Sequence, residues 1–224
     1  MRMTPPAFPD TATVLQLPGP AGALEVAVDP PESDAPRRAL LAVICHPLPT
    51  EGGTMHNKVV TMAARSLREL GATTVRFNFR GTGASEGAFD HGNGEVEDLR
   101  AVVDWARAAR PDAAFVLAGF SFGAYVSIRS AMALRPDGLI SIAPPAGRWA
   151  FESIETPTMP WLVIQGEADE VVDPQAVYDW LARIGARAEL VKMPETSHFF
   201  HRKLIDLRGA IQHGVARWLA DRTA

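Results

Sequence analysis

Short apolar segments alternate along this chain with longer segments of helical spacing. The expected strands cover residues 39–45, 73–79, 114–120, 139–143, 161–165 and 188–193, most of them apolar, and the expected helices cover 57–70, 95–109, 122–134, 174–184 and 202–220. Strands that are apolar along their whole length are typical of a parallel sheet covered by helices on both faces. The alternation therefore predicts an α/β fold.

An N-terminal hairpin precedes this alternation. Residues 13–17 and 23–28 flank the turn-forming segment 18–22, which reads PGPAG. An antiparallel hairpin leading into the parallel strands predicts a mostly parallel sheet of eight strands. With 224 residues, 47% of them hydrophobic, and no linker or repeat, residues 1–224 are expected to form a single domain, with residues 1–12 irregular.

Charge and composition exclude several classes of partner. The net charge is −4 and the basic residues form no stripe, which argues against nucleic acid. No apolar segment of a signal peptide follows Met1, and the longest apolar run, residues 39–45, is too short to span a membrane. Cys45 is the only cysteine, so no intrachain disulfide can form. We expect a cytoplasmic protein, and the sequence leaves its oligomeric state open.

A serine lies at the predicted junction of a strand and a helix. Residues 119–123 read GFSFG, between the expected strand 114–120 and the helix that follows. Serine flanked two residues away by glycines at such a junction is the pattern of a nucleophile elbow, whose tight turn excludes larger side chains at the glycine positions. Ser121 is therefore the candidate nucleophile.

A nucleophilic serine needs a base and an acid that orients the base. In this architecture they follow the serine in the order acid, then histidine, on loops at the carboxyl ends of strands. Asp169 follows the strand 161–165 and His198 follows the strand 188–193. Histidine suits the base because its ordinary pKa lies near neutrality. The sequence therefore predicts a Ser121–His198–Asp169 triad.

Each of these assignments has alternatives nearby in the sequence. Glu167, Glu170 and Asp173 share the loop of Asp169, although Asp173 before Pro174 is typical of a helix N-cap. His201 lies three residues after His198, where a surface histidine near a helix start is the simpler interpretation.

Two backbone N–H groups are expected to form an oxyanion hole. One belongs to Phe122, directly after the serine, and the other to the loop that follows Cys45. Proline has no N–H, which removes Pro47 and Pro49 from that loop. Leu48 is then the nearest candidate, with Thr50 the second.

Taken together, these motifs resemble the α/β-hydrolases. The resemblance rests on His46-Pro47, the segment 78–85 (NFRGTGAS), the serine turn, the segment 166–169 (GEAD) and His198, and it extends from Thr13 to the C-terminus. The nearest group is the small bacterial serine hydrolases related to dienelactone hydrolase. Dienelactone hydrolases use a cysteine nucleophile, so the serine here favours ordinary ester cleavage over lactone hydrolysis.

Many α/β-hydrolases, the family that this chain resembles, carry a cap inserted after the strand that follows the nucleophile helix. Residues 143–160 separate two predicted strands and leave no room for a helical cap, which predicts an open, lidless site. Side chains that could line a shallow acyl pocket there, or simply pack in the core, are Trp149, Phe151, Met159, Phe199 and Phe200.

No cofactor or metal is expected. In the segment 81–87, Glu86 stands where a dinucleotide-binding loop has its third glycine and Gly87 comes one residue late, and the histidines show no HExxH spacing. The predicted function is hydrolysis of short or medium-chain carboxylic esters, with a small-molecule ester or thioester as substrate. The alternatives are a thioesterase, an acyltransferase, a small-peptide hydrolase and a non-catalytic acyl-binding scaffold.

Overall fold

A computed structural model describes residues 4–221. In chain order its elements are β1 (Thr13–Gly19), β2 (Gly22–Asp29), β3 (Leu40–Cys45), the 3₁₀ turn η1 (Pro49–Glu51), α1 (Lys58–Glu69), β4 (Ala72–Phe77), α2 (Asn93–Ala109), β5 (Ala114–Phe120), α3 (Phe122–Leu134), β6 (Gly138–Ile142), β7 (Trp161–Gly166), α4 (Pro174–Arg183), β8 (Ala188–Met193) and α5 (Leu204–Asp221).

All eight of these strands form one sheet, in the order β1-β2-β4-β3-β5-β6-β7-β8. The pairs β1–β2 and β2–β4 are antiparallel and every other pair is parallel, so the predicted mixed sheet is confirmed. The hairpin turn is tighter than the sequence suggested, because Gly19 pairs with Gly22 and only two residues connect the strands. Pro18 fits within β1 because β1 is an edge strand.

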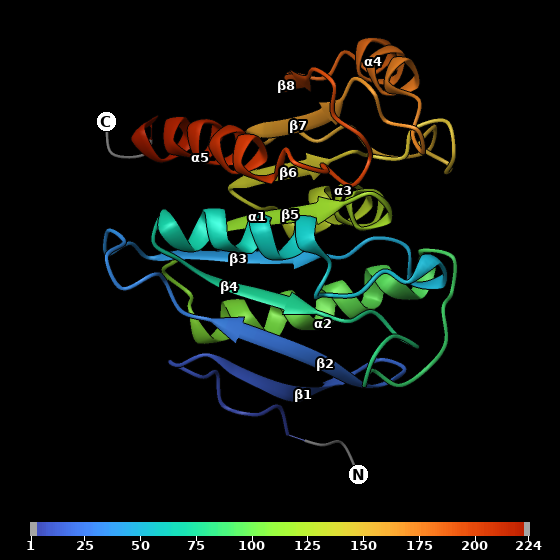
Figure 1. Ribbon diagram of the computed structural model, residues 1–224. Helices are drawn as coiled ribbons and strands as arrows, with labels where there is room; N and C mark the ends of the chain where they lie inside the picture. Colours follow the sequence, from blue (N-terminus) through green and yellow to red (C-terminus); the bar gives the residue numbers. More distant parts are fainter. Residues whose placement is uncertain (1–3, 222–224) are drawn as a thin grey trace.

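Helices cover both faces of the sheet, as Figure 1 shows. On one face, α1 and α5 pack against each other and bury side chains such as Val60, Leu67 and Ile211. On the other face, α2, α3 and α4 bury side chains such as Val102 and Trp180. The sheet is therefore apolar on both sides, which explains why its central strands are continuous apolar runs.

The register of the parallel strands brings four loops to one edge. Cys45 at the end of β3 pairs with Gly119 near the end of β5, and Gly166 at the end of β7 pairs with Met193 at the end of β8. The loops after these strands carry Leu48, Ser121, Asp169 and His198. Parallel pairing thus gathers residues that are far apart in sequence.

Of the segment 1–12 that was predicted to be irregular, residues 4–12 are irregular but packed, and residues 1–3 lie outside the described residues. Within residues 4–12, the Phe8 ring lies 4.8 Å from the ring of Trp105, whose indole N–H donates to the carbonyl of Pro6. Between β6 and β7 there is no helix, as the prediction of a lidless fold requires. Across residues 4–221, no helix is both long and apolar enough to cross a membrane.

Candidate active site

Ser121 lies on the turn between β5 and α3 in a strained backbone conformation. Its φ is 53° and its ψ is −121°, in a region that non-glycine residues rarely occupy. The flanking glycines make the turn possible. A Cβ at Gly119 would lie 2.2 Å from the carbonyl oxygen of Gly123, and one at Gly123 would lie 2.4 Å from that of Cys45. The turn can therefore close only with glycine at both positions.

A chain of hydrogen bonds joins Ser121, His198 and Asp169. His198 Nε2 lies 3.1 Å from Ser121 Oγ, and its Nδ1 lies 2.8 Å from Asp169 Oδ2. An ionised carboxylate can only accept, so Nδ1 carries the ring proton and Nε2 is left to accept from the serine hydroxyl. All three side chains are almost completely buried, with 9% or less of each residue exposed.

Asp169 is held as a carboxylate by four donors. Its Oδ1 accepts from the N–H groups of Val171 and Val172 at 2.9 and 2.7 Å, and its Oδ2 accepts from Gln165 Nε2 at 3.0 Å as well as from His198. Burial would raise the pKa of Asp169, but the hydrogen bonds from His198 and the two backbone N–H groups outweigh it and lower the pKa below its usual value. The carboxylate is therefore ionised at neutral pH.

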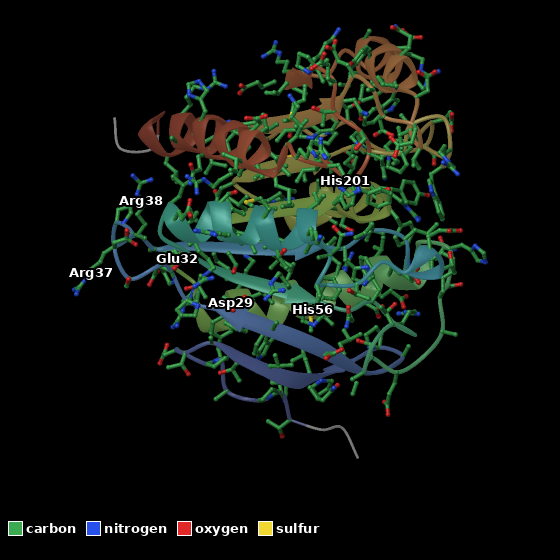
Figure 2. The ribbon with its side chains drawn as sticks, viewed as in Figure 1. Asp29, Glu32, Arg37, Arg38, His56 and His201 are labelled. Carbon is green, nitrogen blue, oxygen red and sulfur yellow. The ribbon has the colours of Figure 1, made fainter. Side chains whose placement is uncertain are left out.

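The alternative acids lie away from the imidazole ring. Glu170 Oε2 accepts from the backbone N–H of His198 at 3.1 Å, which anchors the histidine loop but does not touch the ring. Asp173 caps α4 by accepting from the N–H of Gln175, and Glu167 is exposed. His201, labelled in Figure 2, is exposed on the turn before α5.

The two predicted oxyanion donors meet at the same cavity as Ser121. Phe122 is the first residue of α3, where an N–H has no acceptor within the helix. Leu48 precedes η1, and its N–H has no protein acceptor among the described residues. Both residues line the cavity beside the serine, whereas the exposed Thr50 does not. Leu48 is thus the better placed of the two loop candidates.

The cavity at Ser121 has a volume of about 440 Å³ and is walled mainly by apolar side chains. Its lining consists of Pro47, Leu48, Glu51, Gly52, Gly53, Asn57, Ser121, Phe122, Pro145, Arg148, Trp149, Val171, Val172, His198 and Phe199. Among them, Arg148 is anchored through a hydrogen bond from Nη1 to the carbonyl of Val171 at 2.7 Å.

Of the side chains expected at an acyl pocket, two line the cavity beside Ser121 and the others lie elsewhere. Trp149 and Phe199 line the cavity, but Phe151 and Met159 do not. Phe151 is 2% exposed and packs edge-on against Trp180, because the chain turns back after Trp149 and buries it in the core. Met159 lies at a separate hollow beside Met132 on α3. Phe200 is fully buried.

Two buried polar residues next to the site were missed by the sequence prediction of functional residues. Gln165 donates to Asp169, and the signal for it is a single polar residue at the end of an otherwise apolar strand. His46 contacts the loop of Leu48, and its signal is a histidine directly after a fully buried strand. Neither signal identifies a partner, because several acids follow Gln165 in one irregular loop and the partners of His46 are backbone groups.

Comparison with known proteins gives the family. A family model described as X-Pro dipeptidyl-peptidase (S15 family) matches residues 35–156, more than half of the chain. A lidless α/β serine hydrolase from Xanthomonas campestris is 66% identical, over 95% of this chain and 97% of that chain, with a TM-score of 0.92. The chain belongs to the α/β-hydrolase superfamily.

Two further proteins are similar to this chain over most of their length. An α/β serine hydrolase homologue from Coxiella burnetii is 44% identical over 92% of this hydrolase and 99% of that chain, with a TM-score of 0.88. An uncharacterized protein of Rickettsia prowazekii is 34% identical over 184 residues, 77% of each chain. The molecule is therefore a serine hydrolase of the α/β fold without a lid. The finer relation to dienelactone hydrolase stays an expectation.

Metal ligands do not gather at the site. Among the described residues of this hydrolase, no group of three or more His, Cys, Asp or Glu side chains could hold a metal ion.

Proposed function

We propose that this hydrolase cleaves carboxylic esters of short or medium acyl chain through an acyl-enzyme. The observation that carries the proposal is the hydrogen-bonded chain of Ser121, His198 and Asp169 at the wall of an open, mainly apolar cavity. An apolar wall suits an acyl chain, and a volume of about 440 Å³ suits a small substrate.

In the acylation step, Ser121 Oγ attacks the ester carbonyl while its proton passes to His198 Nε2. Asp169 orients the ring and stabilises the imidazolium that results. The carbonyl oxygen becomes an oxyanion, which accepts hydrogen bonds from the N–H groups of Phe122 and Leu48. Collapse of this intermediate expels the alcohol, which takes the proton from His198.

Deacylation repeats these steps with water. His198 removes a proton from the water, whose oxygen attacks the acyl carbon, and the same two N–H groups stabilise the second oxyanion. Collapse breaks the bond to Ser121 Oγ, and His198 returns its proton to the serine. Because no helix covers the cavity from the segment between β6 and β7, water reaches the acyl-enzyme without an opening step.

Peptide hydrolysis is the second candidate, because the matching family model is described as an X-Pro dipeptidyl-peptidase. That match contains Ser121 and the Leu48 loop but ends before Asp169 and His198. It therefore supports the nucleophile and its surroundings more than it supports an amide substrate. Thioester hydrolysis and acyl transfer need the same residues and differ in the leaving group or the acceptor.

The first test is the reaction of the purified protein with a fluorophosphonate probe, followed by peptide mapping. We expect labelling at Ser121 and its loss in His198→Ala. A panel of p-nitrophenyl esters, acyl thioesters and X-Pro anilides then ranks the substrates, with added alcohols as competing acceptors.

Known effects of substitutions in such triads give the losses of kcat that we expect for variants of this hydrolase. Removing a nucleophile of this kind costs about 10⁶ in kcat, and replacing the orienting aspartate by asparagine costs about 10⁴. We therefore expect Ser121→Ala to abolish ester cleavage and Asp169→Asn to leave a trace. Full activity in Ser121→Ala would overturn the proposal, and tight acyl binding without turnover by the wild type would favour a binding scaffold.

A further inference from the structure

His46 is a buried histidine whose ring does not touch the serine, the base or the acid. It follows β3, is 0% exposed, and its ring lies 4.7 Å from that of Phe79. We propose that His46 is a positioning residue, which holds the peptide between Pro47 and Leu48 so that the Leu48 N–H points into the oxyanion site. The inference rests on the proposed function and adds to it the residue that builds the oxyanion hole.

Two hydrogen bonds determine the tautomer of this ring. The backbone N–H of Phe79 lies 3.0 Å from His46 Nε2, and an N–H can only donate, so Nε2 is the unprotonated acceptor. Nδ1 therefore carries the proton and donates to the carbonyl oxygen of Pro47 at 2.7 Å. The ring bridges the loop after β3 and the loop after β4.

The carbonyl of Pro47 and the N–H of Leu48 belong to one peptide unit. None of the described peptide bonds is cis, and in a planar trans peptide the C=O and N–H point in opposite directions. Because the Pro47 oxygen points at the buried His46 ring, the Leu48 N–H points the other way. Leu48 lines the cavity beside Ser121, and its N–H has no protein acceptor among the described residues.

The rest of the loop is already held in place. The carbonyl of Leu48 accepts from the N–H groups of Glu51 and Gly53 at 3.1 and 3.0 Å. A Cβ at Gly53 would lie 2.2 Å from the Pro47 oxygen, so only glycine allows this approach. The remaining freedom is a flip of the Pro47–Leu48 peptide, which would turn a carbonyl oxygen toward the developing oxyanion. The hydrogen bond from His46 opposes that flip.

Burial keeps this histidine neutral. It lowers the pKa of His46 to about 4, although the hydrogen bond to Pro47 acts in the opposite direction. At neutral pH the ring therefore supplies one donor and one acceptor and no net charge, which suits a positioning role.

Two substitutions separate the donor from the acceptor. In His46→Asn, the amide nitrogen can take the place of Nδ1 and donate to Pro47. In His46→Gln, the amide oxygen can take the place of Nε2 and accept from Phe79. We expect Asn to retain kcat within about 10-fold, and Gln to lose about 10²–10³ in kcat, the effect of one oxyanion donor, with KM little changed. Thermal unfolding of both variants controls for folding.

A double-mutant cycle with Leu48→Pro tests the route of the effect. Proline removes the N–H, and the φ of −53° at Leu48 lies within the range that proline adopts. If His46 acts through this N–H, His46→Gln has little further effect on kcat in the Leu48→Pro background. His46→Ala replaces the Gln variant in the cycle if the latter does not fold.

The outcomes are distinct. Equal losses of kcat in the Asn and Gln variants, or an undiminished loss in the Leu48→Pro background, would overturn the positioning role while leaving the proposed function intact. A wild type that neither reacts with fluorophosphonate nor cleaves esters would overturn the proposed function first, and this inference with it.

Discussion

The side-chain amide of Gln165 donates to Asp169 Oδ2, the same oxygen that binds the His198 ring. Its Nε2 also donates to the carbonyl of Gly166, so both neighbours of the nitrogen are acceptors and the orientation of the amide is determined. The Gln165 oxygen is buried without a hydrogen-bond partner, which is an unfavourable state for a carbonyl. The two hydrogen bonds that Nε2 donates therefore fix the position of the Gln165 side chain.

Replacing Gln165 by leucine should weaken catalysis without changing the reaction. A hydrogen bond to a charged group contributes about 1.5–3 kcal/mol, so we expect kcat/KM to fall by about 10- to 100-fold. Gln175→Leu is the matched control, because Gln175 makes an exposed hydrogen bond to Asp179 on α4. Equal activity of the two variants would contradict the prediction.

Gly123, two residues after Ser121, should not tolerate a side-chain methyl group. Gly123→Ala places a Cβ against the carbonyl oxygens of Cys45 and His46 at 2.4 and 2.5 Å, so β3 and α3 must move apart and the Leu48 loop with them. We expect loss of fluorophosphonate labelling and a lower Tm. Gly209→Ala is the control, because a Cβ there meets nothing within 4 Å on the exposed face of α5. That variant should gain about 0.5–1 kcal/mol of stability.

Cys45 should be inert in the folded protein although it lies beside the Leu48 loop. It is 0% exposed, and burial raises the pKa of its thiol well above the usual range, so almost no thiolate is present at neutral pH. Titration with a thiol reagent should find no reactive cysteine in the native state and one in urea. Rapid native modification would show that β3 opens.

Stability should fall in mild acid because of His46. Its pKa is lowered from 6.5 to about 4 in the fold, so between these values the unfolded chain binds a proton that the folded one does not. The full stability is present above pH 6.5 and decreases as the pH falls toward 4, by about 3 kcal/mol in all. Urea unfolding at pH 7 and 4.5 measures this difference.

His46→Asn removes the titrating group and should flatten that dependence. The exposed His56, labelled in Figure 2, provides the control, and His56→Asn should keep the wild-type slope. An unchanged slope in His46→Asn would mean that other groups cause the acid sensitivity.

Much of the fold followed from local pattern. The predicted bounds of β5 and α3 match the structure, because a buried apolar run and a segment of helical spacing meet at a glycine-flanked serine. Asp169 and His198 could be proposed because each follows the end of a predicted strand, and parallel strands place those ends at one edge of the sheet. The helix predicted over 95–109 begins two residues earlier in the structure, and its first residues, Asn93 and Gly94, are weak helix formers.

Irregular segments were the limit of prediction. Between Ala143 and Pro160 no periodicity indicates which side chains face the cavity, and of the three residues expected there Trp149 lines it whereas Phe151 and Met159 do not. The roles of Gln165 and His46 also lay beyond the pattern, because each depends on the conformation of an irregular loop, that of Asp169 after β7 and that of Phe79 after β4.

The sequence by itself determined the elements, their alternation, and the order of serine, acid and histidine, because these depend on local periodicity, turn chemistry and the direction of parallel strands. Only the tertiary structure decided that Asp169, and no other acid of its loop, meets the His198 ring, that Leu48 lies beside Ser121, and which side chains line the cavity. Those outcomes depend on how loops from β3, β5, β7 and β8 converge, and no local segment of the chain encodes that convergence alone.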